Sequence, residues 1–111
     1  MNDQVLRDLD QFQSALQTHP RVLLFKHSPV CPISAAARAQ FELFKVEHDD
    51  VPTLFVNVIA DRQLARAIAD ECGVRHESPQ VILFEAGQAT WNASHEAITA
   101  ESLAAAWAPR C

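Results

Sequence analysis

The stretch from Val22 to Ser34, VLLFKHSPVCPIS, carries most of the information about the fold. It opens with a continuous apolar run, 22–25, which is typical of a strand buried on both faces of a sheet. A short polar loop follows, and Cys31 then precedes Pro32. Proline is favoured at the first position of a helix because it has no N–H group to leave unpaired. The stretch therefore predicts a buried strand, a loop and a helix that begins directly after Cys31.

The rest of the chain alternates helices and strands around this stretch. Apolar periodicity predicts helices over 8–16, 32–46, 62–72 and 100–107, and strands over 22–25, 53–58, 81–84 and 89–93, the last two forming a hairpin. This order predicts an α/β fold with a central mixed sheet of about four to five strands and helices on both faces. A cysteine between the first strand and the next helix is the layout of the thioredoxin-like fold.

Length and composition place limits on the class of protein. The chain has 111 residues, of which 49% are hydrophobic and 21% charged. These are ordinary globular values, and a chain of this size buries roughly two-thirds of its unfolded surface. We therefore expect one compact domain over residues 1–111, which the order of elements above makes a thioredoxin-like domain. Three cysteines are too few for a disulfide scaffold, and a net charge of −5 argues against nucleic-acid binding.

The sequence also predicts where the protein acts. It contains no apolar run as long as a membrane span, and its first residues lack the basic and apolar regions of a signal peptide. We expect a cytoplasmic protein with no membrane partner, most simply a monomer. Cysteines in that compartment stay reduced and act as catalysts or metal ligands more often than as cross-links. No paired spacing of cysteines or histidines predicts a metal site.

Cys31 is the candidate nucleophile. A cysteine at a helix N-terminus faces unpaired N–H groups and the positive end of the helix dipole. Both favour the thiolate, which is the attacking species in disulfide exchange. Pro32, Ser34, His27 and Ser28 are the residues expected to support the thiolate, Ser34 by a hydrogen bond to the Cys31 sulfur.

The fourth position of the motif Cys31-Pro32-Ile33-Ser34 is serine. A second cysteine there would let the protein resolve its own mixed disulfide, and serine does not. Cys31 would therefore form a mixed disulfide and wait for an external thiol. This predicts monothiol chemistry, in which a small thiol is removed from a protein cysteine or attached to it.

Ser78-Pro79 is the second feature of the candidate site. It precedes a predicted strand, where thioredoxin-like proteins place a cis-proline that faces the nucleophile. The topology therefore predicts a cis bond, although few X–Pro bonds are cis. The backbone of Ser78 would then pair with an incoming disulfide like an added strand.

Three blocks of the sequence resemble the monothiol bacilliredoxin (YtxJ-like) family. Residues 25–34, FKHSPVCPIS, are similar to its signature, residues 74–80, VRHESPQ, to its second block, and Trp91 with 94–95 and 98–99 to its third. The resemblance covers residues 3–107. Pro29-Val30 departs from the family, which commonly has threonine at the first of these positions. The resemblance implies that Cys31 attacks mixed disulfides between proteins and bacillithiol, a low-molecular-weight thiol.

This resemblance also implies the partners and the groove. Bacillithiol is the expected co-substrate, proteins carrying bacillithiol are the expected substrates, and no bound cofactor is expected. The candidate groove residues are Ser78, Pro79, His76, Arg75, Ser94 and His95. We expect His27, His76 and His95, from three strand-end loops, to converge on the thiol, and Lys26 to be a solvated loop residue.

Two other thiols are candidates for resolving the Cys31 mixed disulfide. Cys72 ends the third predicted helix beside Gly73, and Cys111 is the last residue. The simpler interpretation of Cys72 is a small buried apolar side chain. Spacing alone does not establish the geometry that a disulfide needs.

Other functions remain open at this point. Cys31 would be inert in a thioredoxin-like domain without activity, and only capped by a small thiol in a non-catalytic redox sensor or adaptor. A peroxiredoxin-like peroxidase would match Ser28, three residues before Cys31, but would have proline in place of Leu24. An iron–sulfur carrier would have glycine in place of Pro32.

Overall fold

The computed structural model describes residues 3–108. Along the chain the elements are β1 (Asp3–Val5), α1 (Leu9–Thr18), β2 (Arg21–His27), α2 (Pro32–Glu47), β3 (Thr53–Asn57), α3 (Arg62–Cys72), β4 (Gln80–Glu85), β5 (Gln88–Ser94), the 3-10 helix η1 (His95–Ala97) and α4 (Ala100–Trp107).

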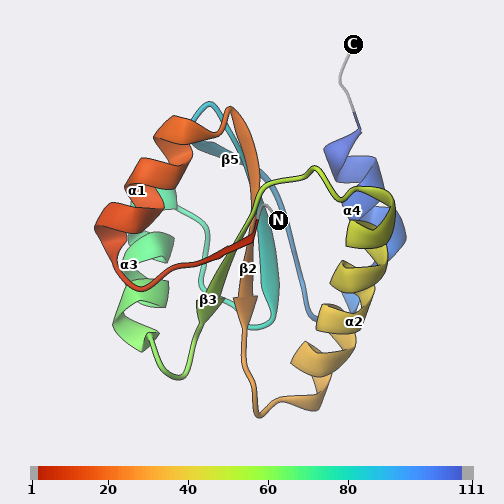
Figure 1. Cartoon of the computed structure of the whole chain (residues 1–111). Helices are drawn as coiled ribbons and strands as arrows, with labels where there is room; N and C mark the ends of the chain where they lie inside the picture. The colour runs from red at the N-terminus through yellow and green to blue at the C-terminus, as the bar shows by residue number, and fades with distance from the viewer. Residues whose placement is uncertain (1–2, 109–111) are drawn as a thin grey trace.

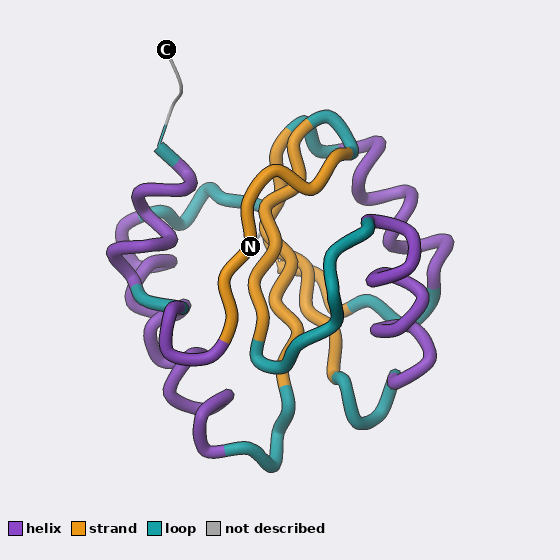
Figure 2. The backbone as a smooth tube through the Cα atoms, turned by 180° about the vertical axis from the view of Figure 1, so that it is seen from behind, coloured by secondary structure: helices purple, strands orange, loops and turns teal. Residues whose placement is uncertain are grey.

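A mixed sheet forms the middle layer of the molecule. Its strand order is β1-β3-β2-β4-β5. β3 runs parallel to both β1 and β2, whereas β4 runs antiparallel to β2 and β5. Helices α1 and α3 cover one face, and α2 and α4 cover the other (Figure 1). The view from behind shows the same strands enclosed between the two helical layers (Figure 2). The predicted thioredoxin-like layout is confirmed.

The alternation of side chains along β2 divides the core into two halves. Val22 and Leu24 pack toward α1 and α3, together with Phe12 and Ile68. Leu23 and Phe25 point the other way, into a cluster under α2 and α4. By the same period of two, Lys26 belongs to the α1/α3 side and His27 to the α2/α4 side. The apolar run of β2 is continuous because both of its faces are covered.

The local signals for helix ends hold in the structure. Asp8 caps α1 by accepting a hydrogen bond from the Gln11 N–H at 2.9 Å. Gly73 ends α3 with a φ of 71°, in the left-handed region where glycine has no steric cost. Pro32 is the first residue of α2, as predicted. None of the helices within 3–108 is long and apolar enough to cross a membrane.

The sequence did not predict β1. This strand has three residues, all of them exposed, at the edge of the sheet. An edge strand of this length shows neither a buried apolar run nor an alternating pattern, so its pairing with β3 leaves no signal in the sequence.

Candidate functional site

The candidate site lies where the carboxyl end of the central strand β2 meets the amino end of β4, along the lower edge of the sheet in Figure 1. Because β4 is antiparallel to β2, with Lys26 opposite Gln80, the loop before β4 reaches the same edge as the loop after β2. The end of β5 arrives there too, since Ser94 pairs with Gln80. The fold therefore gathers the loops 28–31 and 75–79 and the start of η1 around one place.

Cys31 stands at the N-terminus of α2. It has an extended backbone, with φ −103° and ψ 122°, and its carbonyl accepts the first helical hydrogen bond, from Ala35 N–H at 3.0 Å. Its own N–H donates to Ser28 O at 3.3 Å, which closes the loop after β2. The Cys31 side chain is partly exposed and carries a free thiol. This is a position where the backbone N–H groups and the helix dipole stabilise an anion.

Exposed apolar side chains flank the thiol. Val30 is 77% exposed and Ile33 is 42% exposed, on either side of Cys31 and Pro32. A large apolar side chain as exposed as Val30 has no core role, so these residues are available for contact with a second molecule.

Ser34 joins the helix to the end of β2. Its side chain is fully buried, and its Oγ accepts from the Ser28 N–H at 3.0 Å. The same Oγ lies 2.8 Å from His27 Nδ1. The expected hydrogen bond to the Cys31 sulfur is not among its contacts within the described chain, so that prediction is corrected. The short loop brings the Ser28 amide over the first turn of α2, and this amide takes the hydroxyl lone pair.

His27 is held neutral by its surroundings. Burial against the first turn of α2 lowers the pKa of His27, and the nearby Arg38 guanidinium lowers it further. In the neutral tautomer with its proton on Nε2, His27 Nδ1 accepts a hydrogen bond from the Ser34 hydroxyl, while Ser34 Oγ accepts one from the Ser28 N–H. The three groups then satisfy each other in one chain of hydrogen bonds.

This predicts a pH dependence of stability. The folded-state pKa of His27 lies below that of the unfolded chain, so the unfolded state takes up the proton first as pH falls. We expect the free energy of unfolding to decrease as pH drops from about 7 to about 5, through the ordinary histidine pKa of about 6.5. Denaturant unfolding of His27→Gln should show a smaller slope against pH than His19→Gln, a control at the end of α1. Equal slopes would contradict the prediction.

The loop before β4 carries the predicted cis peptide bond, between Ser78 and Pro79. Pro79 O accepts a hydrogen bond from His95 N–H at 3.1 Å, which ties the loop to the start of η1. Ser78 Oγ is buried and has no hydrogen-bond partner among the residues described. A buried hydroxyl in that state is a polar group still available to a ligand or a water.

Arg75 and His95 both lie close to the carboxylate of Glu77 in this loop. Glu77 lies 3.5 Å from Arg75 Nε and 3.7 Å from His95 Nε2. The Arg75 side chain is 91% exposed, so this ion pair contributes little to stability. The structure thus brings Arg75 and His95 to the same acidic residue, which sequence reasoning did not single out.

Lys26 is the clearest correction to the sequence analysis. It is fully buried rather than solvated. Its Nζ lies 3.1 Å from His76 Nδ1 and 3.2 Å from Gln80 Oε1. Its place within a strand, directly after the apolar run, was the available signal, because a lysine there either ends the strand or needs buried partners. The three histidines share this edge, but His27, His76 and His95 each contact a different partner, respectively Ser34, Lys26 and Glu77.

Of the other two thiols, the structure describes Cys72 alone. Cys72 is a partly exposed free thiol that packs against the core under α1 and α3, whereas Cys31 opens α2 on the other face. Cys111 lies outside the described residues. No group of three or more His, Cys, Asp or Glu side chains in the described part of the chain is placed to hold a metal ion.

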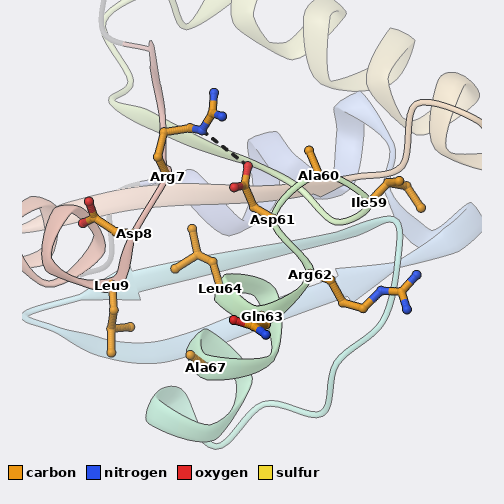
Figure 3. Close-up of a pocket in the computed structure, with 10 residues that line it drawn as sticks. All are labelled: Arg7, Asp8, Leu9, Ile59, Ala60, Asp61, Arg62, Gln63, Leu64 and Ala67. Carbon is orange, nitrogen blue, oxygen red and sulfur yellow. Dashed lines mark ion pairs between the residues drawn. The ribbon is translucent and has the colours of Figure 1, made fainter.

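Three surface hollows bear on where a ligand would sit. One of about 530 Å³ lies between α2 and η1, and Ile33, Gln40 and His95 are among its lining residues. Another of about 550 Å³, between the starts of α1 and α3, is crossed by the Arg7–Asp61 ion pair (Figure 3). The second hollow contains none of the predicted site residues, whereas His95 lines the first, and Cys31 is among the lining residues of neither. A third hollow, of about 620 Å³, lies beside the end of α3, and Arg75 and His76 are among its lining residues.

Comparison with known proteins agrees with this fold and motif. The family described as "Monothiol bacilliredoxin BrxC" matches residues 4–103. A solved structure assigned as an oxidoreductase with a thioredoxin fold is 38% identical, with a TM-score of 0.88, over 95% of this chain and 93% of that chain.

More distant structures show the fold alone. Mitochondrial thioredoxin 3 from Saccharomyces cerevisiae is 16% identical with a TM-score of 0.74, over 93% of this chain and 91% of that chain. A thioredoxin from Malassezia sympodialis is 22% identical with a TM-score of 0.73, over 96% and 90%. The match over nearly the whole chain, together with the sequence and fold shared with the oxidoreductase above, places this chain in the monothiol bacilliredoxin family of thioredoxin-fold oxidoreductases.

Proposed function

We propose that this protein is a cytoplasmic thiol–disulfide oxidoreductase that uses Cys31 to remove bacillithiol from mixed disulfides with protein cysteines. The observation that carries this proposal is the pairing of a partly exposed Cys31 at a helix N-terminus with a buried serine at the fourth position of the motif. The first residue can attack a disulfide, and the second cannot form one.

The exchange step conserves electrons. The Cys31 thiolate attacks the bacillithiol sulfur of the mixed disulfide, and a new Cys31–bacillithiol disulfide forms as the old sulfur–sulfur bond breaks. The protein cysteine leaves as a thiolate and takes a proton from solvent. The N-terminus of α2 stabilises the negative charge on Cys31 before the attack.

Regeneration then needs a thiol from outside the protein. A second thiolate attacks Cys31 Sγ or the bacillithiol sulfur, which breaks the Cys31–bacillithiol disulfide and forms a new disulfide with the attacking thiol. Two electrons from a dithiol or a reductase then reduce the new disulfide, so that Cys31 and bacillithiol are both recovered as thiols. Ser34 has no part in this step, since its hydroxyl is occupied by His27 and Ser28. The Cys72 thiol packs on the opposite side of the sheet from α2, so we assign regeneration to a separate molecule.

The loop 75–79 and the end of β5 form the proposed groove. The backbone of Ser78 and its unpartnered buried hydroxyl are available to the incoming disulfide. Arg75, His76 and His95 lie at the same edge and supply N–H donors suited to the carboxylates of a small thiol. Ser94, opposite Gln80, closes this edge.

A turnover assay tests the proposal against a non-catalytic sensor. Reduced protein, at a small fraction of the substrate concentration, is mixed with a bacillithiol-modified protein and an excess of a regenerating thiol. We expect many equivalents of bacillithiol to be released per Cys31. Release that stops at one equivalent, with Cys31 fully capped, would contradict the enzymatic proposal and favour the sensor.

A further inference from the structure

Lys26 is a buried cation whose hydrogen-bond partners are neutral groups. Its side chain is fully buried on the α1/α3 side of the sheet. It contacts Gln80 Oε1, directly opposite in the β2–β4 register, and Nδ1 of the exposed His76. A buried lysine is costly unless its N–H groups are used, so these two contacts are the ones that keep it in place.

Gln80, which contacts Lys26, also binds the backbone of the loop before β4. Its Oε1 also accepts from Glu77 N–H at 3.4 Å, and its Nε2 donates to Arg75 O at 3.0 Å. The Lys26 and Gln80 side chains therefore hold the backbone of Arg75 and Glu77 and the ring of His76 in place. These are the residues directly before Ser78 and the cis-Pro79.

The contact with Lys26 also determines the protonation of His76. An ammonium group donates hydrogen bonds and accepts none, so His76 Nδ1 must be the acceptor. The ring proton then lies on Nε2, on the side of the ring away from Lys26. Burial, the Lys26 charge and the Arg66 charge on α3 all lower the pKa of His76, while Glu77 opposes them. Burial lowers the pKa of Lys26 as well, and Cys72 and Glu77 oppose that shift.

We propose that Lys26 is a positioning residue, which holds His76 as a neutral donor through Nε2 and, with Gln80, fixes the loop that presents Ser78 and Pro79 to the substrate. This inference rests on the proposed function, because the loop it positions is the proposed groove. A loop displaced by a single ångström is enough to slow a reaction on the order of a hundredfold.

The test compares Lys26→Met with Lys45→Met. Methionine fills the space of the lysine side chain without a charge. Lys45→Met is the control, because it makes the same substitution at a lysine that pairs with Asp3 of β1 at 2.8 Å, away from the loop. NMR titration of His76 should move to higher pH in Lys26→Met, because the like charge is gone, and stay unchanged in Lys45→Met. The exchange rate should fall about tenfold to a hundredfold in Lys26→Met only.

A measurement on the unsubstituted protein keeps the inference testable even if Lys26→Met does not fold. Nitrogen NMR at neutral pH should show His76 as the neutral tautomer with its proton on Nε2. A proton on Nδ1, or an unchanged His76 titration in folded Lys26→Met, would overturn the inference. Both readouts need no substrate, so they remain valid if the turnover assay shows that bacillithiol is not the thiol removed.

Discussion

Replacing Cys31 with alanine is expected to abolish the release of bacillithiol from a modified protein. The attacking sulfur is lost, and the proposed mechanism has no step without it. Loss of a covalent nucleophile costs several orders of magnitude in rate, so activity should fall to the background of the uncatalysed exchange. The measurement is the turnover assay with the Cys31→Ala protein.

Cys72→Ala is the matched control for that experiment. It removes a partly exposed free thiol of the same chain and creates a similarly small change in packing. We expect its turnover to equal that of the unsubstituted protein. Residual turnover in Cys31→Ala together with a loss of turnover in Cys72→Ala would show that Cys72 rather than Cys31 is the nucleophile. That result would contradict the proposed mechanism.

Ser34→Ala is expected to destabilise the fold while leaving Cys31 able to react. The substitution removes the acceptor of the buried Ser28 N–H and the partner of His27 Nδ1. A buried donor left unsatisfied costs about 1–3 kcal/mol. We expect denaturant unfolding to show a loss of that size. Cys31 should still form a mixed disulfide, because Pro32 and the start of α2 place it independently of the Ser34 hydroxyl.

Ser14→Ala provides the comparison on an exposed helix position. Ser14 lies on α1, where its side chain is exposed, so the same substitution should change stability by less than about 0.5 kcal/mol. If Ser34→Ala and Ser14→Ala were equally stable, the hydrogen bonds around Ser34 would not hold the loop to the helix, and this part of the site would need another explanation.

Features with strong local chemistry were predictable from the sequence. Pro32 marks the start of α2 because its ring fits the first helical position, and Gly73 marks the end of α3 because it adopts a positive φ. The cis bond before Pro79 followed from topology rather than from local sequence. In each of these cases the residue type, or its place in the fold, allows few backbone conformations other than the one observed.

Long-range polar contacts were not predictable in the same way. Lys26 and Gln80 are 54 positions apart, and their contact depends on the register of β2 against β4, which periodicity does not fix. Ser34 was predicted to contact Cys31, its neighbour in the motif, but the folded loop offers the Ser28 amide and the His27 ring instead. Within the candidate site, the sequence singled out Cys31 as the proposed nucleophile, and the structure supplied the partners of the residues around it.

The most direct test of the central claim is intact-mass analysis of the reduced protein mixed with bacillithiol disulfide, beside glutathione disulfide, over a range of pH. The account predicts one bacillithiol adduct, mapped to Cys31, which forms rapidly near neutral pH and faster than the glutathione adduct. Equal, slow labelling of all three cysteines by both disulfides would contradict it, because Cys31 would then have neither the reactivity nor the thiol preference on which the proposed function depends.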